Sequence, residues 1–562
     1  MIEKVKEFEK VIDQKLENLS SLKCSGVDAV KMIIAAIETS YISNSSTEQF
    51  LKKGLDILLP YYVNNSSNGN LPNAKRFLKD LEYASHYFML REFLYYSYNT
   101  SDSIEWKFNK RKVKIGYKDS SIPRQFFLIA DNYFSKSQEI FSDYSPTSEK
   151  IISLLKPYEE FTDNQDAREA LELIKKEAEL KINNYYNFIN DHEMSSITLG
   201  TYNLKEMFEV IKSLLIKALY HRYYSRIHKN PIPVIVSLDE IAQAIHEESS
   251  LSLQKCRNIL LDITYRKGEK INPVYFPLYY FEETNEILMS PHIFCQWEAY
   301  VNVLRLIALR NNKIFQNQLS SILSDNFVNK IESLFKEQGF ICKTNVDLQQ
   351  FDTSLPDIDL LIVSEEPALG YVVYCCEVKN PIPPQWAKDH LRVLNKDSVI
   401  KSFSQIKKID NFLHTEQGIN FIRSILPTKI PTNLNNNFLV VVNHLIITSN
   451  NSGMFFTEKN QTIIDYNTLS RILKNSDGDI AYIMHLTKTL NKHLDNCYSK
   501  QQVELKIDNL KVNYEGVAIK HLLDFPQNRW KSNGTDQKLL EEFINEGLHP
   551  FDMFDELQEK DD

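Results

Sequence analysis

Apolar residues recur at three- and four-residue spacing through the first 100 residues, as at Val30, Ile33, Ile34 and Ile37. This spacing predicts amphipathic helices. Similar patterns continue to residue 227, and prolines at positions 231 and 233 then predict a domain boundary near residue 230. We therefore expect a mainly α-helical N-terminal region over residues 1–230.

One segment of this region alternates instead of repeating every three or four residues. Residues 104–118 read IEWKFNKRKVKIGYK, with apolar positions between lysines and an arginine. Alternation of this kind predicts a β-hairpin with a cationic face. Basic residues interleaved with aromatics could contact a phosphate backbone, and an ordinary solvated strand face explains the same pattern.

Residues 231–318 show a different order of elements. A helix is predicted over 239–248, a serine-rich turn follows, and a second helix is predicted over 253–264. Two strand-like runs and a connecting apolar helix complete the segment. Helix, turn, helix and hairpin are the layout of a winged helix. The second helix would be the one that reads DNA, but it offers few groups that could contact bases, namely Gln254, Lys255, Arg257 and Asn258. A winged helix that serves only packing or protein contacts is therefore as compatible with the sequence as one that binds DNA.

From residue 319 to about 495, helices and strands alternate. A helix predicted over 326–338 ends at Gly339, because glycine commonly ends helices in the left-handed conformation. A strand, two further apolar runs, a proline-rich break, a helical zone over 386–415 and another apolar strand follow. This order predicts a C-terminal α/β domain with a mixed sheet.

The C-terminal residues, 496–562, are rich in acids and end in FDELQEKDD. Such a composition predicts a solvated acidic tail. A tail that imitates nucleic acid and shields a basic groove is the alternative.

Composition narrows the class of protein. A chain of 562 residues is too long for one core and should divide into several domains. Its net charge of −9 argues against a protein that coats nucleic acid, although a local cationic groove is compatible with it. Seven scattered cysteines form no CxxC pair, and no secretory signal, membrane-length apolar run or Walker A glycine loop occurs. We expect a soluble, reduced, cytoplasmic protein without membrane contact.

Candidate chemistry is concentrated in residues 355–380, LPDIDLLIVSEEPALGYVVYCCEVKN. Two apolar runs flank a short polar turn, and side chains two apart on a strand share a face. If the runs pair as a hairpin, Asp359 lies beside Glu377 with Lys379 next to it, although the acids are 18 residues apart in sequence (377 − 359).

Two carboxylates at one point are difficult to keep ionised unless a cation neutralises them. A small number of hard oxygen ligands favours Mg²⁺, with Mn²⁺ as the alternative. A nearby lysine can orient or deprotonate a water, or stabilise charge that develops on a phosphate. This combination predicts metal-assisted hydrolysis of phosphodiester bonds. The simpler alternative is that these acids only cap strand ends and keep them soluble.

The motif Pro356-Asp357-x-Asp359, an apolar strand and then Glu377-x-Lys379 resembles the PD-(D/E)XK nuclease superfamily, which has the restriction-endonuclease-like fold, over about residues 320–490. The resemblance implies that Asp359 and Glu377 bind the metal and that Lys379 assists the attacking water. Asp357 shares the face of Asp359 and is a second candidate ligand for the metal.

The resemblance also assigns residues on two helices. Glu332 is the nearest match to an acid that family members often carry on the preceding helix. Gln405 matches a glutamine on the following helix, where it would join the catalytic set. Lys401 and Lys408 on that helix could hold phosphates.

The tripeptide ExK is not specific by itself, because residues 179–181 and 504–506 also satisfy it. The first lies in a helical pattern, and no upstream Asp opens an apolar strand before the second. The order of the surrounding elements is what selects Glu377.

The expected function is a Mg²⁺-dependent endonuclease that acts on nucleic acid, DNA in the first instance, in restriction or defence against phage. The alternative is a DNA-binding regulator, or an oligomeric scaffold assembled through the helical N-terminal region, whose nuclease fold is inactive.

Overall fold

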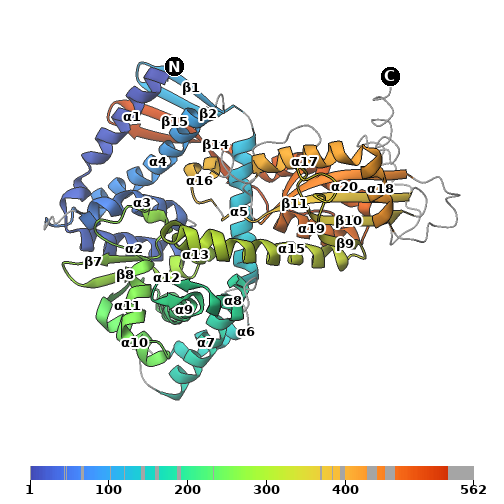
Figure 1. The fold of residues 1–562 in the computed structure, drawn as a ribbon. Coiled ribbons are helices and arrows are strands. Elements are labelled where there is room, and N and C mark those ends of the chain that lie inside the picture. The colour runs from blue at the N-terminus through green and yellow to red at the C-terminus, as the bar shows by residue number, and fades with distance from the viewer. Residues whose placement is uncertain are drawn as a thin grey trace.

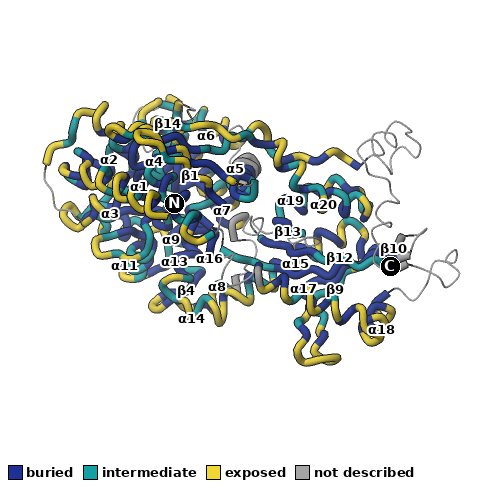
Figure 2. The backbone as a smooth tube through the Cα atoms, turned by 90° about the horizontal axis from the view of Figure 1, so that it is seen from above, coloured by how far each residue is buried: buried dark blue, intermediate teal, exposed yellow. Residues whose placement is uncertain are grey.

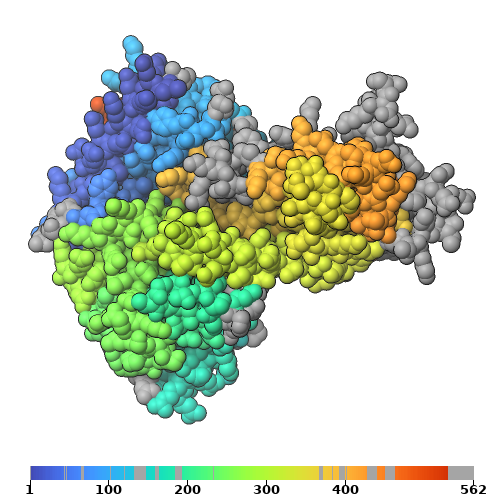
Figure 3. Space-filling model, in the orientation of Figure 1, coloured from blue at the N-terminus to red at the C-terminus, as the bar shows by residue number. Residues whose placement is uncertain are grey.

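Figure 1 shows a computed structural model of the protein, which describes residues 2–43, 45, 47–64, 69–100, 103–118, 120–140, 146–157, 164–186, 191–231, 233–366, 370–382, 384–392, 399–426, 439–449 and 462–528. A larger body contains the N-terminal helices and the segment after them, and an α/β domain lies beside it. In the space-filling view this domain, yellow to orange, projects from the blue and green body (Figure 3).

Four helices form the first part of the larger body. They are α1 Ile2–Glu17, α2 Gly26–Ile42, α3 Glu48–Asn64 and α4 Ala74–Asn99, with the turn η1 Ser20–Lys23 after the first. Their apolar stripes meet in one core, which confirms the predicted amphipathic helices. Gly26 lets α2 begin against α3, because a Cβ there would lie 2.2 Å from the carbonyl oxygen of Tyr62.

The helical region continues to residue 228. Its elements are α5 Ser121–Ile140, α6 Pro146–Leu155, α7 Gln165–Tyr186, α8 Asp191–Ser196, the short strands β3 Thr198–Leu199 and β4 Tyr202–Asn203, and α9 Leu204–His228. A capping box formed by Asn203 and Glu206 starts α9, and Lys229 ends it in the left-handed conformation. This end lies close to the predicted boundary near residue 230.

The next segment follows the predicted order of helix, turn, helix and strands. It contains β5 Val234–Ser237, α10 Leu238–Glu248, α11 Leu253–Asp262, β6 Thr264–Tyr265, η2 Pro273–Tyr275, β7 Leu278–Phe281 and β8 Glu286–Met289. The strands form a sheet in the order β5-β8-β7-β6. Helices α12 Pro291–Phe294 and α13 Trp297–Arg310 lead out of the segment.

A nearly continuous helical run then crosses into the α/β domain. It consists of α14 Asn312–Ile314, a π-helical turn η3 Phe315–Leu319 and α15 Ser320–Lys336. The boundary predicted between residues 318 and 319 therefore falls inside this run, and α15 begins at Ser320 and not at Asn326. Gly339 follows α15 with φ of 87°, the left-handed conformation that glycine adopts without strain.

The α/β domain is built on a five-stranded mixed sheet in the order β13-β12-β11-β10-β9. Its strands are β9 Ile341–Val346, β10 Ile358–Glu366, β11 Gly370–Lys379, β12 Leu439–Thr448 and β13 Thr462–Asp465. β9, β10 and β11 pair antiparallel, and β11, β12 and β13 pair parallel. The predicted α/β domain with a mixed sheet is confirmed.

Helices cover both faces of this sheet (Figures 1 and 2). They are α15, α17 Val399–Leu413, α18 Glu416–Ile425, α19 Tyr466–Ser476 and α20 Ile480–Cys497. The short helix α16 Ala387–Arg392 packs instead against α4 of the larger body. Leu360 and Ile362 share a core with α15, α19 and α20, whereas Leu361 and Val363 share a core with α17 and α18. Alternate side chains of β10 therefore face opposite layers.

The residues expected to form an acidic tail are partly folded, which corrects that prediction. β14 Tyr498–Ile507 and β15 Leu510–Ile519 form a hairpin, and β15 pairs in parallel with β2. The predicted hairpin of residues 104–118 is present as β1 Ile104–Asn109 and β2 Lys112–Tyr117. The result is a four-stranded sheet, β1-β2-β15-β14, that joins two distant parts of the chain. Residues 529–562 lie outside the described residues.

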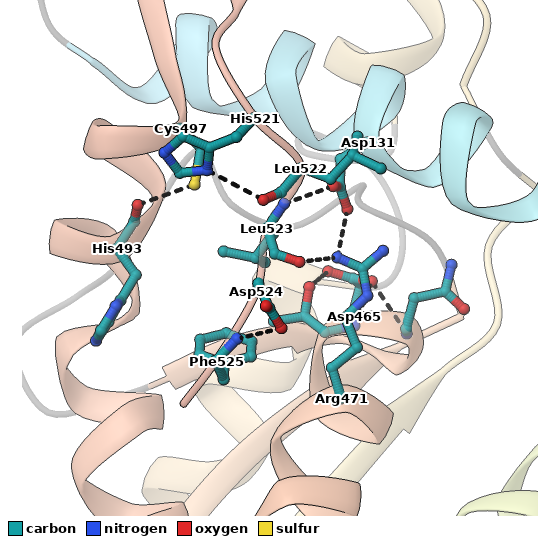
Figure 4. Close-up of polar contacts among 12 residues, drawn as sticks. Asp131, Asp465, Arg471, His493, Cys497, His521, Leu522, Leu523, Asp524 and Phe525 are labelled. Carbon is teal, nitrogen blue, oxygen red and sulfur yellow. Dashed lines mark hydrogen bonds and ion pairs between the residues drawn. The ribbon is translucent and has the colours of Figure 1, made fainter. Parts of the chain in front are cut away.

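Residues 520–528 run from β15 along α19 and α20 (Figure 4). Asp131 of α5 accepts a hydrogen bond from the Leu523 amide at 2.8 Å and pairs with Arg471 of α19 at 2.9 Å. Arg471 also donates to the Leu523 carbonyl at 2.7 Å, and Asn475 donates to the Phe525 carbonyl at 2.9 Å. These contacts tie the chain after β15 to both α5 and the α/β domain.

Two further expectations concern the protein as a whole. All seven cysteines are unpaired thiols, and six of them are buried. Among the helices that the structure describes, none combines the length and the apolar character that crossing a bilayer requires.

Candidate functional site

The three residues singled out by the sequence meet at one end of the β10–β11 hairpin. The ladder between these strands runs from Glu366 opposite Gly370 to Leu360 opposite Cys376. Asp359 and Glu377 occupy the next opposite positions, and Lys379 lies one strand repeat beyond. The expected hairpin register therefore brings the two acids side by side.

Direct contacts link these side chains. The backbone N–H of Val378 donates a hydrogen bond to Asp359 Oδ2 at 2.7 Å. Lys379 Nζ forms an ion pair with Glu377 Oε1 and lies 4.0 Å from Asp359 Oδ2. The lysine is thus shared between the two carboxylates.

Burial makes this group electrostatically unusual. The side chain of Glu377 is 2% exposed, and desolvation together with the charge of Asp359 raises its pKa to about 7, against the opposing effects of Lys379 and Lys401. Desolvation also raises the pKa of Asp359, with Lys379 and the Val378 amide acting in the opposite direction. Two acids of raised pKa at one point are typical of functional sites.

Two buried oxygens at this end of the domain lack hydrogen-bond partners among the described residues. They are Glu377 Oε2 and Gln405 Oε1. A buried polar atom without a partner is costly, so a native structure usually supplies one. An unsatisfied carboxylate oxygen beside a second carboxylate is an arrangement that a divalent cation would satisfy.

The helix α17 places further polar groups near the acids. It packs against β11 and β12, and the charge of Lys401 acts on Glu377. Gln405 follows Lys401 by four residues and so lies on the same side of the helix. Lys408 is less available, because its Nζ donates to the Ser354 carbonyl at 3.2 Å.

The remaining predicted acids occupy different surroundings. Asp357 is exposed and accepts a hydrogen bond from Gln349 at 3.4 Å, although its charge still acts on Asp359. Glu332 pairs with Lys336 of its own helix at 2.8 Å. Asp359, and neither of these two acids, is among the groups whose charge shifts the pKa of Glu377.

Asp325 of α15 is the acid that sequence reasoning missed. Its charge contributes to the raised pKa of Asp359, so it lies within electrostatic range of the site. The sequence pattern places the start of this helix at Asn326, which leaves Asp325 outside it. A helix that begins at Ser320 instead carries Asp325 one turn before the buried Val328, and this longer helical pattern is the signal that could have identified it.

The backbone opposite Asp359 is also irregular. β9 and β10 pair at Ile358–Val346 and at Leu360–Thr344, and between them Asn345 has φ of 50°. Asn tolerates this left-handed conformation better than most residues. Backbone irregularity of this kind often accompanies functional sites.

The segment after β11 is held by buried polar contacts to the larger body. Arg305, 2% exposed, pairs with Asp389 at 3.3 Å and donates to the Ile382 carbonyl at 3.2 Å. Glu92 of α4 accepts the Ala387 N–H at 2.8 Å at the start of α16. These contacts fix the chain that leaves the lysine end of β11.

The donor set fits a hard divalent cation with few protein ligands. Within the described part of the chain, no group of three or more His, Cys, Asp or Glu side chains is arranged to hold a metal. Mg²⁺ commonly binds through one or two carboxylates and completes its shell with water or substrate phosphate. Asp359 and Glu377 are compatible with that kind of site.

A cavity of about 460 Å³ lies elsewhere, between α1, α3, α4 and Trp386. Neither Asp359 nor Glu377 lines it. The chemistry of the buried acids, and not the size of a cavity, therefore identifies the candidate site.

Comparisons with protein-family models, with curated proteins and with solved structures give no match to this chain.

Proposed function

We propose that the protein is a metal-dependent nuclease that hydrolyses phosphodiester bonds in nucleic acid. DNA is the proposed substrate, endonucleolytic cleavage the proposed reaction, and restriction or defence against phage in the cytoplasm the proposed role. Mg²⁺ is the proposed metal, with Mn²⁺ able to replace it.

The observation that carries this proposal is the meeting of Asp359, Glu377 and Lys379. Two desolvated carboxylates lie beside a lysine that contacts both, and one of them has a buried oxygen with no hydrogen-bond partner in the described part of the chain. A purely structural strand end has no need of two acids of raised pKa at one point.

The order of elements supports a restriction-endonuclease-like fold for this domain. α15, β9, β10 and β11 are followed by α17 and then by β12, which pairs in parallel with β11. This is the helix, strand, acid-bearing strand, ExK strand, helix and strand order on which the resemblance to the PD-(D/E)XK superfamily rests.

The proposed roles follow from position and charge. Asp359 and Glu377 would hold the metal, and Asp357 could bind it through water because it is exposed close by. When bound, the metal would polarise the phosphate and lower the pKa of a water molecule. Lys379 would orient the attacking water. Gln405, whose Oε1 has no hydrogen-bond partner among the residues that the structure describes, would hold the water or the substrate.

We do not propose that α11 reads DNA. Lys255 pairs with Glu206 at 2.6 Å, and Arg257 pairs with Asp239 at 2.6 Å. Asn258 donates to Thr201 at 2.9 Å. Because these groups already have partners within the chain, they support packing as the role of this winged-helix-like segment.

Separate alanine substitutions at Asp359, Glu377 and Lys379 test the proposal. Cleavage of plasmid and of single-stranded substrates would be measured with Mg²⁺ or EDTA. Each substitution should abolish the Mg²⁺-dependent cleavage of the native protein. Unchanged cleavage in all three would refute the site, whereas DNA binding without any cleavage by the native protein would favour the regulator or scaffold.

A further inference from the structure

The four-stranded sheet β1-β2-β15-β14 has one apolar and one basic face. Trp106, Ile115, Val512 and Tyr514 are buried against the helices of the larger body. Side chains of alternate residues point to the opposite face. The outer face therefore carries the lysines that alternate with these apolar positions.

Strand register gathers lysines from distant parts of the sequence on this face. Lys112 lies opposite Lys511 in the parallel pair, and Lys511 lies opposite Lys506 in the hairpin. In the neighbouring row Lys107 lies opposite Lys114. Lys110 and Arg111 occupy the turn between β1 and β2. We call these seven residues the lysine face.

Few acids balance this charge. Lys107 pairs with Glu105 at 2.9 Å, and Lys511 pairs with Glu504 at 2.8 Å. Glu515, further along β15, lies 3.9 Å from Lys500. The other members of the lysine face have no carboxylate oxygen within 4.0 Å among the described residues; they are Lys110, Arg111, Lys112, Lys114 and Lys506. A chain of net charge −9 thus presents a locally cationic surface.

The lysines of this face are spaced as an extended polyanion would require. Neighbouring strands lie about 4.8 Å apart, so the row from Lys112 through Lys511 to Lys506 spans roughly 10 Å. The next row on the same face lies about 7 Å further along the strands. A nucleic acid backbone offers phosphates closely enough to contact both rows at once.

We propose that the lysine face binds the phosphate backbone of nucleic acid, with little dependence on base sequence, at a distance in the sequence from the carboxylates of the α/β domain. The inference rests on the proposed function for the identity of the polyanion. Contacts with phosphates would then supply affinity for the substrate. The surface that makes these contacts forms only when β15 pairs with β2.

The composition of this face favours nucleic acid over a membrane surface. Membrane-binding surfaces add aromatic or aliphatic residues that enter the lipid. No residue of β1, β2, β14 or β15 is among the exposed large apolar side chains of the described chain.

The test measures binding in EDTA, where metal-dependent cleavage is suppressed. A labelled duplex of about 30 base pairs, long enough to contact both rows, is titrated by fluorescence anisotropy at several salt concentrations. The variant replaces Lys112, Lys114 and Lys506 by glutamine. A matched control replaces Lys75, Lys79 and Lys313, which are exposed lysines outside the lysine face. Circular dichroism and the unfolding temperature verify that both triple variants fold.

Each neutralised phosphate contributes about 0.9 to the slope of log binding constant against log salt, so the first variant should reduce this slope by about 2 to 3. The control should leave it unchanged. An equal loss in both variants, no loss in the first, or tighter binding to anionic vesicles than to duplex would overturn the inference. Glu377→Gln distinguishes the binding proposal from the catalytic one. If this variant binds duplex like the native chain but does not cleave it, the result supports the lysine face as the binding surface. Loss of binding in Glu377→Gln would contradict the lysine face as the binding surface.

Discussion

Replacing Glu377 by glutamine should stabilise the metal-free protein at alkaline pH. Glu377 is nearly fully buried, and its pKa of about 7 exceeds the ordinary glutamate value of 4.5. Ionised Glu377 therefore destabilises the folded state, whereas glutamine, which has the shape of the protonated acid, is neutral at every pH. In the native protein, the buried negative charge of Glu377 would thus lower the free energy of unfolding.

The magnitude follows from the shift in pKa. A raised carboxyl pKa makes the folded state hold more protons than the unfolded state between pH 4.5 and 7, so stability falls as the pH rises through this range. At about 1.4 kcal/mol per pKa unit the full penalty is about 3.5 kcal/mol. Between about pH 5 and about pH 8.5 the advantage of Glu377→Gln should therefore grow by about 2.5 kcal/mol.

The assay is urea-induced unfolding in EDTA at these two pH values. The free energy of unfolding is taken from the transition in which the α/β domain unfolds. Glu365→Gln is the control, because Glu365 is an exposed carboxylate on the same hairpin. When EDTA is replaced by Mg²⁺ at about ten times its dissociation constant, the metal should add about 1.4 kcal/mol to the native protein and nothing to Glu377→Gln. An advantage that is the same at both pH values, or that the control shares, would refute the reasoning.

Three further predictions concern the site and its support. Asp359→Asn should lower Mg²⁺-dependent cleavage at least about a hundredfold, whereas Asp357→Asn should change initial rates only a few-fold, because Asp357 is exposed; equal losses would contradict the assignment. Mg²⁺ affinity, measured by calorimetry, should weaken by up to about tenfold per pH unit below about 7 as protons compete at Glu377, and a flat profile would exclude Glu377 as a ligand. Arg305→Met should destabilise the protein by about 3–5 kcal/mol in urea unfolding, because it leaves Asp389 buried without its cation, and a change below about 1 kcal/mol would contradict that role.

The candidate site was largely predictable because strand geometry is local. Alternation along β10 and β11 and one short turn are enough to set Asp359 beside Glu377 and Lys379. The ion pair between Lys379 and Glu377 was not predictable, and neither was the lack of a hydrogen-bond partner for Glu377 Oε2 among the described residues. Both depend on rotamers and on burial by α17, which sequence periodicity does not specify.

Asp325 and the tail were misjudged for different reasons. Sequence patterns locate the start of a helix only to within a few residues. α15 begins six residues before the predicted start (326 − 320), so Asp325 lies inside the helix and not before it. The acidic composition of the C-terminal residues obscured a hairpin, and its parallel partner β2 lies 399 positions away (511 − 112). Pairing over such a distance depends on the whole fold and leaves no local pattern.

The charged contacts that hold the segment after β11 were also invisible in the sequence. Arg305 and Asp389 lie on segments that both read as ordinary helices, the connecting apolar helix and the helical zone over 386–415. Only packing brings them together, and only burial makes their pairing important.

Cleavage of supercoiled plasmid by the native chain and by Glu377→Gln, each with Mg²⁺ and with EDTA, tests the central claim most directly. The native protein should nick or linearise the plasmid with Mg²⁺ and do neither in EDTA. Glu377→Gln, at least as stable as the native protein at about pH 8 without metal, should leave the plasmid intact in both. Equal cleavage by the two proteins with Mg²⁺ would contradict the claim that Asp359, Glu377 and Lys379 form a metal-dependent nuclease site.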